Sequence, residues 1–313
     1  MKTKIIAVIG PTASGKTSLA VKIAERFNGS VISADSMQIY KHMQIATAKP
    51  TREEMKNIRH YLIDFLEPSE AYSVGQYVSD AKQAVREILS EGKLPIICGG
   101  TGLYVDSLLN GIDFVDDSVD NALRNELKSL CEEKGVDYLL DILREFDPES
   151  AQRLSSEKNP KRVARAIEIY KTTGITITEQ NKNSRLRESE FEPLCFGLTA
   201  DNRQYLYDRI NHRVDLMLKE GLIDEARGIL SRGLSDTARG AIGYRQLKPY
   251  FDGEKSLDEC IERLKIETRH YAKRQLTWFK RNENIIWLNI DELKTADDQL
   301  NSIDSKIRGF LYG

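Results

Sequence analysis

The sequence has little of what marks membrane, secreted or metal-clustered proteins. Its 313 residues contain only four cysteines, and these are single and widely spaced, which is typical neither of a zinc site nor of a disulfide framework. No apolar run approaches the ~20 residues of a membrane span, and no charged leader with a cleavage site precedes the first apolar run. Internal repeats and low-complexity segments are also missing. We therefore expect a soluble, cytoplasmic protein whose cysteines are small core residues: Cys98, Cys131, Cys195 and Cys260.

Net charge is similarly small, at −2, although about 30% of the residues are charged. A chain of this length corresponds to roughly two domains. Any affinity for a polyanion must then come from a local basic surface, because the protein as a whole is nearly neutral.

The most informative stretch is an eight-residue, glycine-bounded loop between the apolar run at 5–9 and the helical pattern at 19–24. This context of strand, loop and helix is the one that a P-loop requires, since the backbone N–H groups and the helix N-terminus then converge on phosphate. The lysine adds a full charge, and the last threonine offers a hydroxyl to Mg²⁺. The alternative is a plain turn between strand and helix. The predicted phosphate-binding residues are Gly10, Pro11, Thr12, Ala13, Ser14, Gly15, Lys16 and Thr17.

Two further turns follow predicted strands. The strand at 30–34 leads to Asp35, whose carboxylate could hold Mg²⁺, accept a proton or cap the next turn. The strand at 94–98 leads to Gly99-Gly100-Thr101-Gly102, where three glycines permit close approach to a ligand and Thr101 offers a hydroxyl. A turn that holds no ligand remains the alternative. Ligands of open α/β sheets bind at these strand ends.

The alternation of strand and helix stops after residue 112. From Asp113 to about residue 192 the patterns are nearly all helical, beginning with an acidic stretch within 113–120. A helix predicted to begin at Pro160 places Arg162 and Arg165 on one face, which is either a binding face or a solvated one. The strand at 195–198 returns the chain to the sheet, so we expect an inserted helical domain.

A later helix carries two arginines in register. The apolar pattern at 202–219 predicts a helix on which Arg209 and Arg213 lie one turn apart. Two arginines so placed can clamp a diphosphate, because each guanidinium offers a fork of donors.

The segment from 263 to 281 is unusually basic, with seven Lys or Arg against one Glu. Its heptad residues Leu264, Tyr271 and Trp278 are predicted to pack inward. That arrangement turns three cations outward, as a nucleic-acid footprint or a solvated face: Arg269, Lys273 and Lys280.

Other elements are predicted with less detail. They comprise a helix start at 51–54, a strand at 61–64, a helix at 74–89, a last strand at 285–288 and a tail helix from Glu292 to near Phe310.

Several blocks of the sequence, taken in order, resemble the tRNA dimethylallyltransferase family, which modifies adenosine 37 beside the anticodon. The resemblance covers nearly the whole chain. Departures are Ala46, where glycine is expected, and Ile58-Arg59-His60-Tyr61 in place of a proline-histidine-histidine run. The zinc-finger extension of some eukaryotic relatives is missing. The resemblance rests on GPTASGKT at Gly10, ISADSMQIYKHMQIATAKPT from Ile32, YSVGQY at Tyr72, GGTGLYVDSLL at Gly99, NPKRVARAIEIY at Asn159, RGAIGYRQL at Arg239 and YAKRQLTWFKR at Tyr271.

The resemblance implies an α/β fold: a P-loop NTPase-like parallel sheet flanked by helices, with an inserted all-helical domain. Residues 1–112 and 196–313 would form the catalytic P-loop core, and 113–195 the inserted tRNA-binding domain. The enzyme would transfer a dimethylallyl group from dimethylallyl diphosphate to N6 of adenosine 37. The P-loop, Arg209 and Arg213 would bind the diphosphate with Mg²⁺ at Thr17, while Asp35 accepts the N6 proton and Thr101 orients the reacting groups.

The resemblance also implies that tRNA, through its anticodon stem-loop, is the macromolecular partner, and we expect a monomer. A P-loop kinase and a non-enzymatic RNA-binding module remain the two competing hypotheses. In a kinase, Asp35 would activate a phosphate acceptor. The residues expected to contact tRNA are Asp35, Ser36, Met37, Gln38, Thr101, Arg124, Asn159, Pro160, Lys161, Arg162, Val163, Arg239, Gly240, Tyr244 and Arg245.

Overall fold

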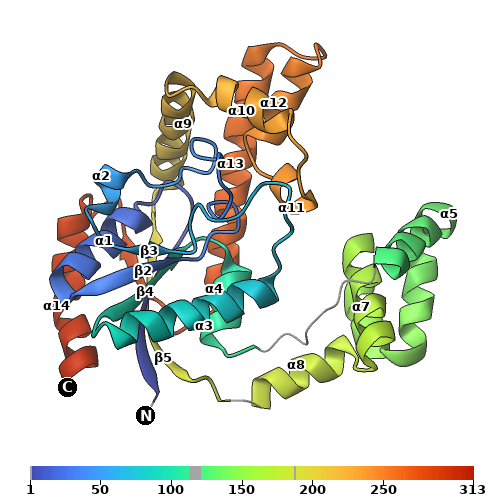
Figure 1. The fold of residues 1–313 in the computed structure, drawn as a ribbon, viewed down its shortest axis with the longest axis horizontal. Coiled ribbons are helices and arrows are strands. Elements are labelled where there is room, and N and C mark those ends of the chain that lie inside the picture. Colours follow the sequence, from blue (N-terminus) through green and yellow to red (C-terminus); the bar gives the residue numbers. More distant parts are fainter. Residues whose placement is uncertain (1, 113–120, 187) are drawn as a thin grey trace. The chain divides into compact units, whose positions relative to one another are not determined.

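The computed structural model describes residues 2–112, 121–186 and 188–313. The chain divides into two compact units, one formed by Met1–Leu109 with Glu190–Gly313 and the other by Asn110–Ser189 (Figure 1). The acidic stretch predicted within 113–120 lies outside the described residues, as does the predicted domain boundary at 113. Among the described helices, none is both long enough and apolar enough to cross a membrane.

A parallel sheet organises the first unit, as predicted. Its strands lie in the order β3-β2-β4-β1-β5-β6, and every pair is parallel. The strands read as continuous apolar runs because helices cover both faces of such a sheet; Ile5, Ile6 and Val8, for example, are fully buried. The strands are β1 (Thr3–Ile9), β2 (Gly29–Ser33), β3 (His60–Tyr61), β4 (Leu94–Gly99), β5 (Phe191–Thr199) and β6 (Ile286–Asn289).

Strand register brings the predicted functional turns to one edge of this sheet. Ile9 at the end of β1 pairs with Gly99 at the end of β4, and Ser33 at the end of β2 pairs with Cys98. The three loops that leave these strands therefore start at nearly the same level. They are the P-loop, the turn at Asp35 and the turn at Thr101.

Helices pack on this sheet in groups that are distant in sequence. Helix α1 packs against α14, α3 packs against α4, and α13 contacts α4, α9 and α12. The core joins Leu19 and Ile23 of α1 to Phe196 of β5 and Ile303 and Ile307 of α14. The helices of this unit are α1 (Lys16–Phe27), α2 (Arg52–Met55), α3 (Val74–Ser90), α4 (Gly102–Leu109), α9 (Arg203–Lys219), α10 (Leu222–Leu230), α11 (Asp236–Arg239), α12 (Tyr244–Phe251), α13 (Leu257–Phe279) and α14 (Ala296–Tyr312).

Three predicted boundaries were wrong. The strand predicted at 61–64 ends at Tyr61, because Leu62 (φ 57°) and Asp64 (φ 59°) adopt left-handed backbone conformations that a strand cannot contain. The tail helix begins at Ala296 instead of Glu292, since the Thr295 side chain caps it there by accepting from the Asp298 N–H. The strand predicted at 195–198 already begins at Phe191.

The described part of the second unit is helical, as predicted. Gly135 breaks the helical geometry within its first helix, α5, and the apolar core joins α5 to α7 through residues such as Leu143 and Val163. Helix α7 begins at Pro160 as expected, with the Asn159 side chain as its cap. The helices are α5 (Asn121–Phe146), α6 (Pro148–Ser155), α7 (Pro160–Thr173) and α8 (Ile177–Leu186).

The carboxylate of Asp147 links two helices of the second unit, and its ionisation is expected to make the stability of that unit depend on pH. Its carboxylate accepts from the Ser150 N–H at 3.0 Å and from the Thr178 hydroxyl at 2.5 Å, so it links α6 to α8. Burial opposes ionisation, but the hydrogen bonds from Thr178 and Ser150 outweigh it and lower the pKa of this carboxyl.

We expect Asp147→Asn to destabilise this unit at neutral pH by about 1–3 kcal/mol, because a charged acceptor of several hydrogen bonds is removed. A lowered pKa contributes stability above the unfolded value of about 4, and that contribution disappears as the pH falls through the folded value. The gap between variant and wild type should therefore close on acidification, as measured by denaturant unfolding from neutral pH downward. A gap that is independent of pH would contradict the assignment.

Candidate functional site

The P-loop leaves β1 at Gly10 and enters α1 after Gly15. Gly10 (φ +144°) and Gly15 (φ +96°) adopt conformations that L side chains rarely adopt, and a Cβ on Gly10 would lie 2.8 Å from the Leu198 carbonyl oxygen. Gly15 is the N-cap of α1, so the N–H groups of the first turn point out of the helix end without a side-chain cap. Ser14 is buried in the loop, and its hydroxyl meets no hydrogen-bond partner among the described residues. The loop thus brings together several hydrogen-bond donors, namely the N–H groups of the first turn of α1 and the Ser14 hydroxyl.

Lys16 reaches back across this loop. Its ammonium donates to the Pro11 carbonyl oxygen at 2.7 Å. The pKa of Lys16 is lowered to about 8, chiefly by burial; the nearby Cys98 and Asp35 oppose this lowering, and Arg213 adds to it. A partly buried cation that donates to a neutral carbonyl is favourably placed to bind an anion.

Both predicted arginines of α9 contact carbonyl oxygens of loops at this edge of the sheet. Arg209 Nε donates to the Ala13 carbonyl oxygen of the P-loop at 2.8 Å. Arg213 Nη2 lies 3.5 Å from the Ala48 carbonyl oxygen, and burial lowers the pKa of Arg213. The structure therefore places both arginines beside the P-loop, whereas their role toward a diphosphate stays a prediction.

Asp35 caps a turn and still has an oxygen available. Its Oδ1 accepts from the Met37 N–H at 2.9 Å and from the Gln38 N–H at 3.3 Å, so the capping alternative is real. No hydrogen bond within the described part of the chain reaches Oδ2. One carboxylate can accordingly hold the turn and accept a proton from a ligand.

Thr101 is joined to the Asp35 turn by backbone and side chain. Its N–H donates to the Ala34 carbonyl oxygen at 3.1 Å, and its Oγ1 accepts from the Ser36 N–H at 3.0 Å. The hydroxyl of Thr101 and the carboxylate of Asp35 therefore lie on two linked turns beside the P-loop. This is the grouping that the strand ends predicted.

Packing within the protein accounts for the glycines around Thr101, while the predicted close approach of a ligand stays a prediction. A Cβ on Gly99 would lie 2.1 Å from the Ala34 carbonyl oxygen. One on Gly100 would lie 2.1 Å from Gln275 Nε2, and one on Gly102 would lie 2.2 Å from Trp278. These glycines allow the turn to pack against β2 and α13.

The loop after the Asp35 turn is held by Glu225 of α10, a residue that the sequence did not single out. Its carboxylate accepts from three consecutive N–H groups, those of Gln44, Ile45 and Ala46, at 2.7–2.9 Å. The Tyr244 hydroxyl donates to the same carboxylate at 2.8 Å. Because Ala46 takes part through its backbone, the departure from glycine there leaves this anchor in place.

Gln38 is oriented by the same loop. Its Nε2 donates to the carbonyl oxygens of Thr47 and Ala48, each at 3.2 Å. Glu225 thus influences the Asp35 turn through the loop that contacts Gln38. Nothing in the pattern of α10, an ordinary amphipathic helix, distinguishes Glu225 from a solvated acid.

Several cationic and polar residues expected at the tRNA surface already have partners in the second unit. Arg124 and Arg165 both pair with the buried Glu168, at 2.9 and 3.1 Å, and Asn159 is occupied as a helix cap. The predicted pair on α7 is unequal in exposure, since Arg162 is exposed and pairs with Glu157, whereas Arg165 is half-buried.

Val163 and Tyr244 differ from the other residues expected to contact tRNA. Both side chains are fully buried, Val163 in the core of the second unit and Tyr244 against Glu225. Packing uses the side-chain atoms of both residues, and the contact with tRNA expected of the stretches that contain them stays a prediction. The exposed members of the set are Arg124, Asn159, Pro160, Lys161, Arg162, Arg239, Gly240 and Arg245.

The basic helix α13 was only partly predicted. Lys273 and Lys280 are exposed, as expected, and Trp278 points inward to donate from Nε1 to a carboxylate of α4 at 2.7 Å. Arg269 is half-buried and donates to the Asn211 side chain at 2.7 Å, so its outward placement was wrong. A polar residue on the inward face, Gln275, was not anticipated.

Metal binding has few protein ligands available. Within residues 2–112, 121–186 and 188–313, no group of three or more His, Cys, Asp or Glu side chains is placed to hold an ion. The Thr17 hydroxyl lies at the start of α1, near the Cys98 thiol. A divalent ion at Thr17 would thus depend on oxygens of the ligand and of water for most of its coordination.

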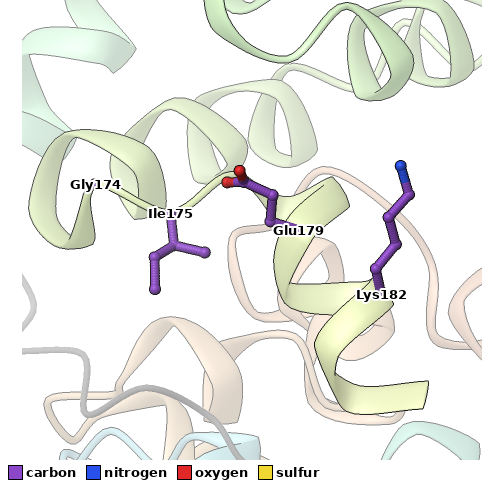
Figure 2. A pocket seen from close by; sticks show the side chains of 4 residues that line it. All are labelled: Gly174, Ile175, Glu179 and Lys182. Carbon is purple, nitrogen blue, oxygen red and sulfur yellow. The ribbon is translucent and has the colours of Figure 1, made fainter. Parts of the chain in front are cut away.

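A hollow in the second unit does not form a competing site. Gly174, Ile175, Glu179 and Lys182 line it, and Figure 2 shows the charged ends of Glu179 and Lys182 pointing in different directions. Glu179 accepts from the N–H and the hydroxyl of Thr176, each at 2.9 Å, and Lys182 pairs with a glutamate of α6 at 3.1 Å. The cluster of cations at the P-loop remains the candidate site.

These features define the class of the protein: a P-loop α/β protein with a cluster of cations, suited to a phosphorylated ligand, beside a carboxylate and a hydroxyl. The family model described as IPP transferase matches residues 38–282, and the chain belongs to this family. A tRNA dimethylallyltransferase of Acetivibrio thermocellus is 47% identical over 301 residues, covering 96% of each chain.

Solved structures agree with this assignment. The tRNA isopentenylpyrophosphate transferase of Bacillus halodurans is 42% identical, with a TM-score of 0.73 and coverage of 99% of this chain and 97% of that one. A eukaryotic dimethylallyltransferase, described as acting on tRNA, is 27% identical, with a TM-score of 0.81 and coverage of 98% of this chain and 79% of that one. The predicted fold class and family are confirmed.

Proposed function

We propose that this protein transfers a dimethylallyl group from dimethylallyl diphosphate to N6 of adenosine 37 of tRNA, next to the anticodon, and releases diphosphate. Near-full-length likeness to tRNA dimethylallyltransferases supports transfer of this group to tRNA. The observation that supports the chemistry most directly is that a cationic loop and a carboxylate oxygen to which no hydrogen bond is made by the described residues lie on adjoining loops at one edge of the sheet.

The P-loop and the cations beside it would bind the diphosphate of the prenyl donor. Lys16, the N–H groups at the start of α1 and the two arginines of α9 supply positive charge from three directions. As the allylic C–O bond breaks, negative charge grows on the departing diphosphate, and these donors would stabilise it because the fold already gathers them at the P-loop.

The Asp35 side would accept the proton. The amine nitrogen N6 attacks the allylic carbon, the C–O bond to diphosphate breaks, and the proton leaves N6 for Oδ2 of Asp35. Thr101, whose Oγ1 is fixed by the Ser36 N–H, would orient the reacting groups. Charge and atoms balance, since the products are the alkylated adenosine, diphosphate and a protonated carboxyl.

Magnesium is part of the proposal. Thr17 would hold it together with diphosphate oxygens, as the donor set at the start of α1 permits, and the ion would neutralise charge on the leaving group.

The adenosine must leave its stack to reach these loops, which favours a single-stranded loop as substrate. Exposed cations of α7 and α13 would contact phosphates of the anticodon stem-loop and position it. We place this activity in the cytoplasm and expect a monomer to perform it.

One assay separates the proposal from its competitors. Labelled dimethylallyl diphosphate and labelled ATP are each offered with unmodified tRNA. We expect label from the prenyl donor, and not from ATP, to enter tRNA at the adenosine beside the anticodon. Transfer or hydrolysis of ATP at enzyme-like rates would favour the kinase, while binding without any transfer would favour an RNA-binding module.

Exposed cations of α7 predict how tRNA binding responds to salt. Replacing Lys161 and Arg162 with alanine should weaken binding to all substrate tRNAs alike and flatten the salt dependence by about 0.7–0.9 for each phosphate interaction removed. Lys294 and Lys306, also exposed and beside or on α14, provide the matched control pair. Equal salt slopes for the two double variants, measured by filter binding across salt concentrations, would remove α7 from the tRNA interface.

A further inference from the structure

Gln275 connects the two glycine-rich loops of the site. It is 5% exposed on the inward face of α13. Its Oε1 accepts from the Thr12 N–H of the P-loop at 2.9 Å, and its Nε2 donates to the Gly100 carbonyl oxygen at 2.9 Å. Both partners are backbone groups of fixed polarity, so the orientation of this amide is determined by them.

Each of the two anchor points adjoins a residue of the proposed chemistry. Thr12 is next to Ala13, whose carbonyl oxygen receives a hydrogen bond from an arginine of α9. Gly100 is next to Thr101, whose hydroxyl accepts from the N–H that follows Asp35. The side chain of Gln275 therefore joins the diphosphate-binding loop to the turn that carries the orienting hydroxyl.

The surroundings of Gln275 are adapted to this connection. Gly100 lies so close that a Cβ there would be 2.1 Å from Nε2, so the turn could not approach the amide with a side chain. One helical turn earlier, Tyr271 lies near Thr101, and three residues later Trp278 donates from Nε1 to a carboxylate of α4 at 2.7 Å. Gln275 and Trp278 therefore bond the inward face of α13 to the β4-to-α4 segment at two points.

We propose that Gln275 is a positioning residue, which sets the separation of the P-loop and the Gly99–Gly102 turn and so aligns the bound prenyl donor with Asp35 and Thr101. This inference rests on the proposed function. It gives the basic helix two faces with different roles, since the outward face carries exposed lysines and the inward face determines the geometry of the reaction site.

The expected effect follows from how transfer depends on alignment. Without the amide, the Thr12 N–H and the Gly100 carbonyl are left without this partner in a buried place, and the two loops can relax apart. A misplacement of about 1 Å in reacting groups costs roughly 10²-fold in rate. Loss of the Gln275 amide should lower turnover more than the affinity for tRNA, because the exposed surfaces of the protein are unchanged.

Two variants and one control test the proposal. Gln275→Met keeps the size of the side chain and removes both hydrogen bonds, whereas Gln275→Asn keeps the amide but is too short to span both loops. Thr277→Ala, on the exposed face of the same helix, is the control. We expect kcat to fall about 10–100-fold in both Gln275 variants, with the KM for tRNA within a few-fold of wild type, at temperatures well below each melting point.

A second measurement does not require turnover. The affinity for inorganic diphosphate, measured by calorimetry, should weaken about tenfold in Gln275→Met and stay unchanged in Thr277→Ala. If Gln275→Met fails to fold, Gln275→Asn decides. Folded variants with wild-type kcat and diphosphate affinity would overturn the positioning role. A wild-type protein that never transfers the prenyl group would overturn the proposed function, and the diphosphate affinities alone would then test the role of Gln275.

Discussion

Replacing Asp35 with alanine is expected to lower turnover by about 10²–10⁴-fold, the range typical for loss of a general base. The physical reason is that Oδ2 is the carboxylate oxygen without a hydrogen bond among the described residues, on a turn linked to Thr101. Steady-state and single-turnover transfer to tRNA, with tRNA binding measured separately, would give the size of the effect.

Because Oδ1 also caps the turn, alanine alone cannot separate the two roles of this residue. Asp35→Asn provides the matched variant, since its amide oxygen can still accept from the Met37 and Gln38 N–H groups but cannot take up the proton. We expect both variants to be slow. If Asp35→Asn is active and Asp35→Ala is inactive, Asp35 only caps the turn and does not act as the general base.

Replacing Lys16 with alanine should weaken diphosphate binding by about 30-fold or more, because truncating a desolvated charge partner costs about 2 kcal/mol or above. Transfer should slow as well, since charge on the leaving group grows in the transition state. Titration with inorganic diphosphate and the kcat/KM for the prenyl donor measure the two effects.

Lys22 is the matched control for Lys16. It lies further along the same helix, where its partly exposed side chain pairs with Asp297 at 2.8 Å. Lys22→Ala removes one positive charge of the protein without altering the P-loop, and we expect nearly unchanged diphosphate affinity. Equal reductions in the two variants would mean that long-range charge, and not the Lys16 ammonium in the loop, attracts the anion.

The site was predictable where it depends on consecutive residues. An apolar strand, a glycine-bounded loop and a helix define the P-loop locally, and the parallel order of the strands brings Asp35 and Thr101 to the same edge. Even the helix start at Thr51 could be expected, because Glu54 completes a capping box within four residues.

Residues that act across the fold could not be found in this way. Glu225 and Gln275 bind backbone groups 180 and 263 positions away, and no periodicity in their helices records those partners. Heptad spacing placed Trp278 correctly but misplaced Arg269, since the partner of Arg269, Asn211, lies on α9. The sequence indicated Gln275 in one way only: it is a polar residue between Tyr271 and Trp278, two aromatic residues predicted to pack inward.

The second unit leaves and re-enters the rest of the chain at a single place. A Cβ on Gly111 would lie 3.4 Å from the Ser189 Cα, so the first and last residues of the unit run side by side. All six of the described strands lie outside Asn110–Ser189, and none of their pairings uses a residue from it. The helical unit is thus an insertion between α4 and β5, and its removal or replacement would leave every described strand pairing of the sheet intact.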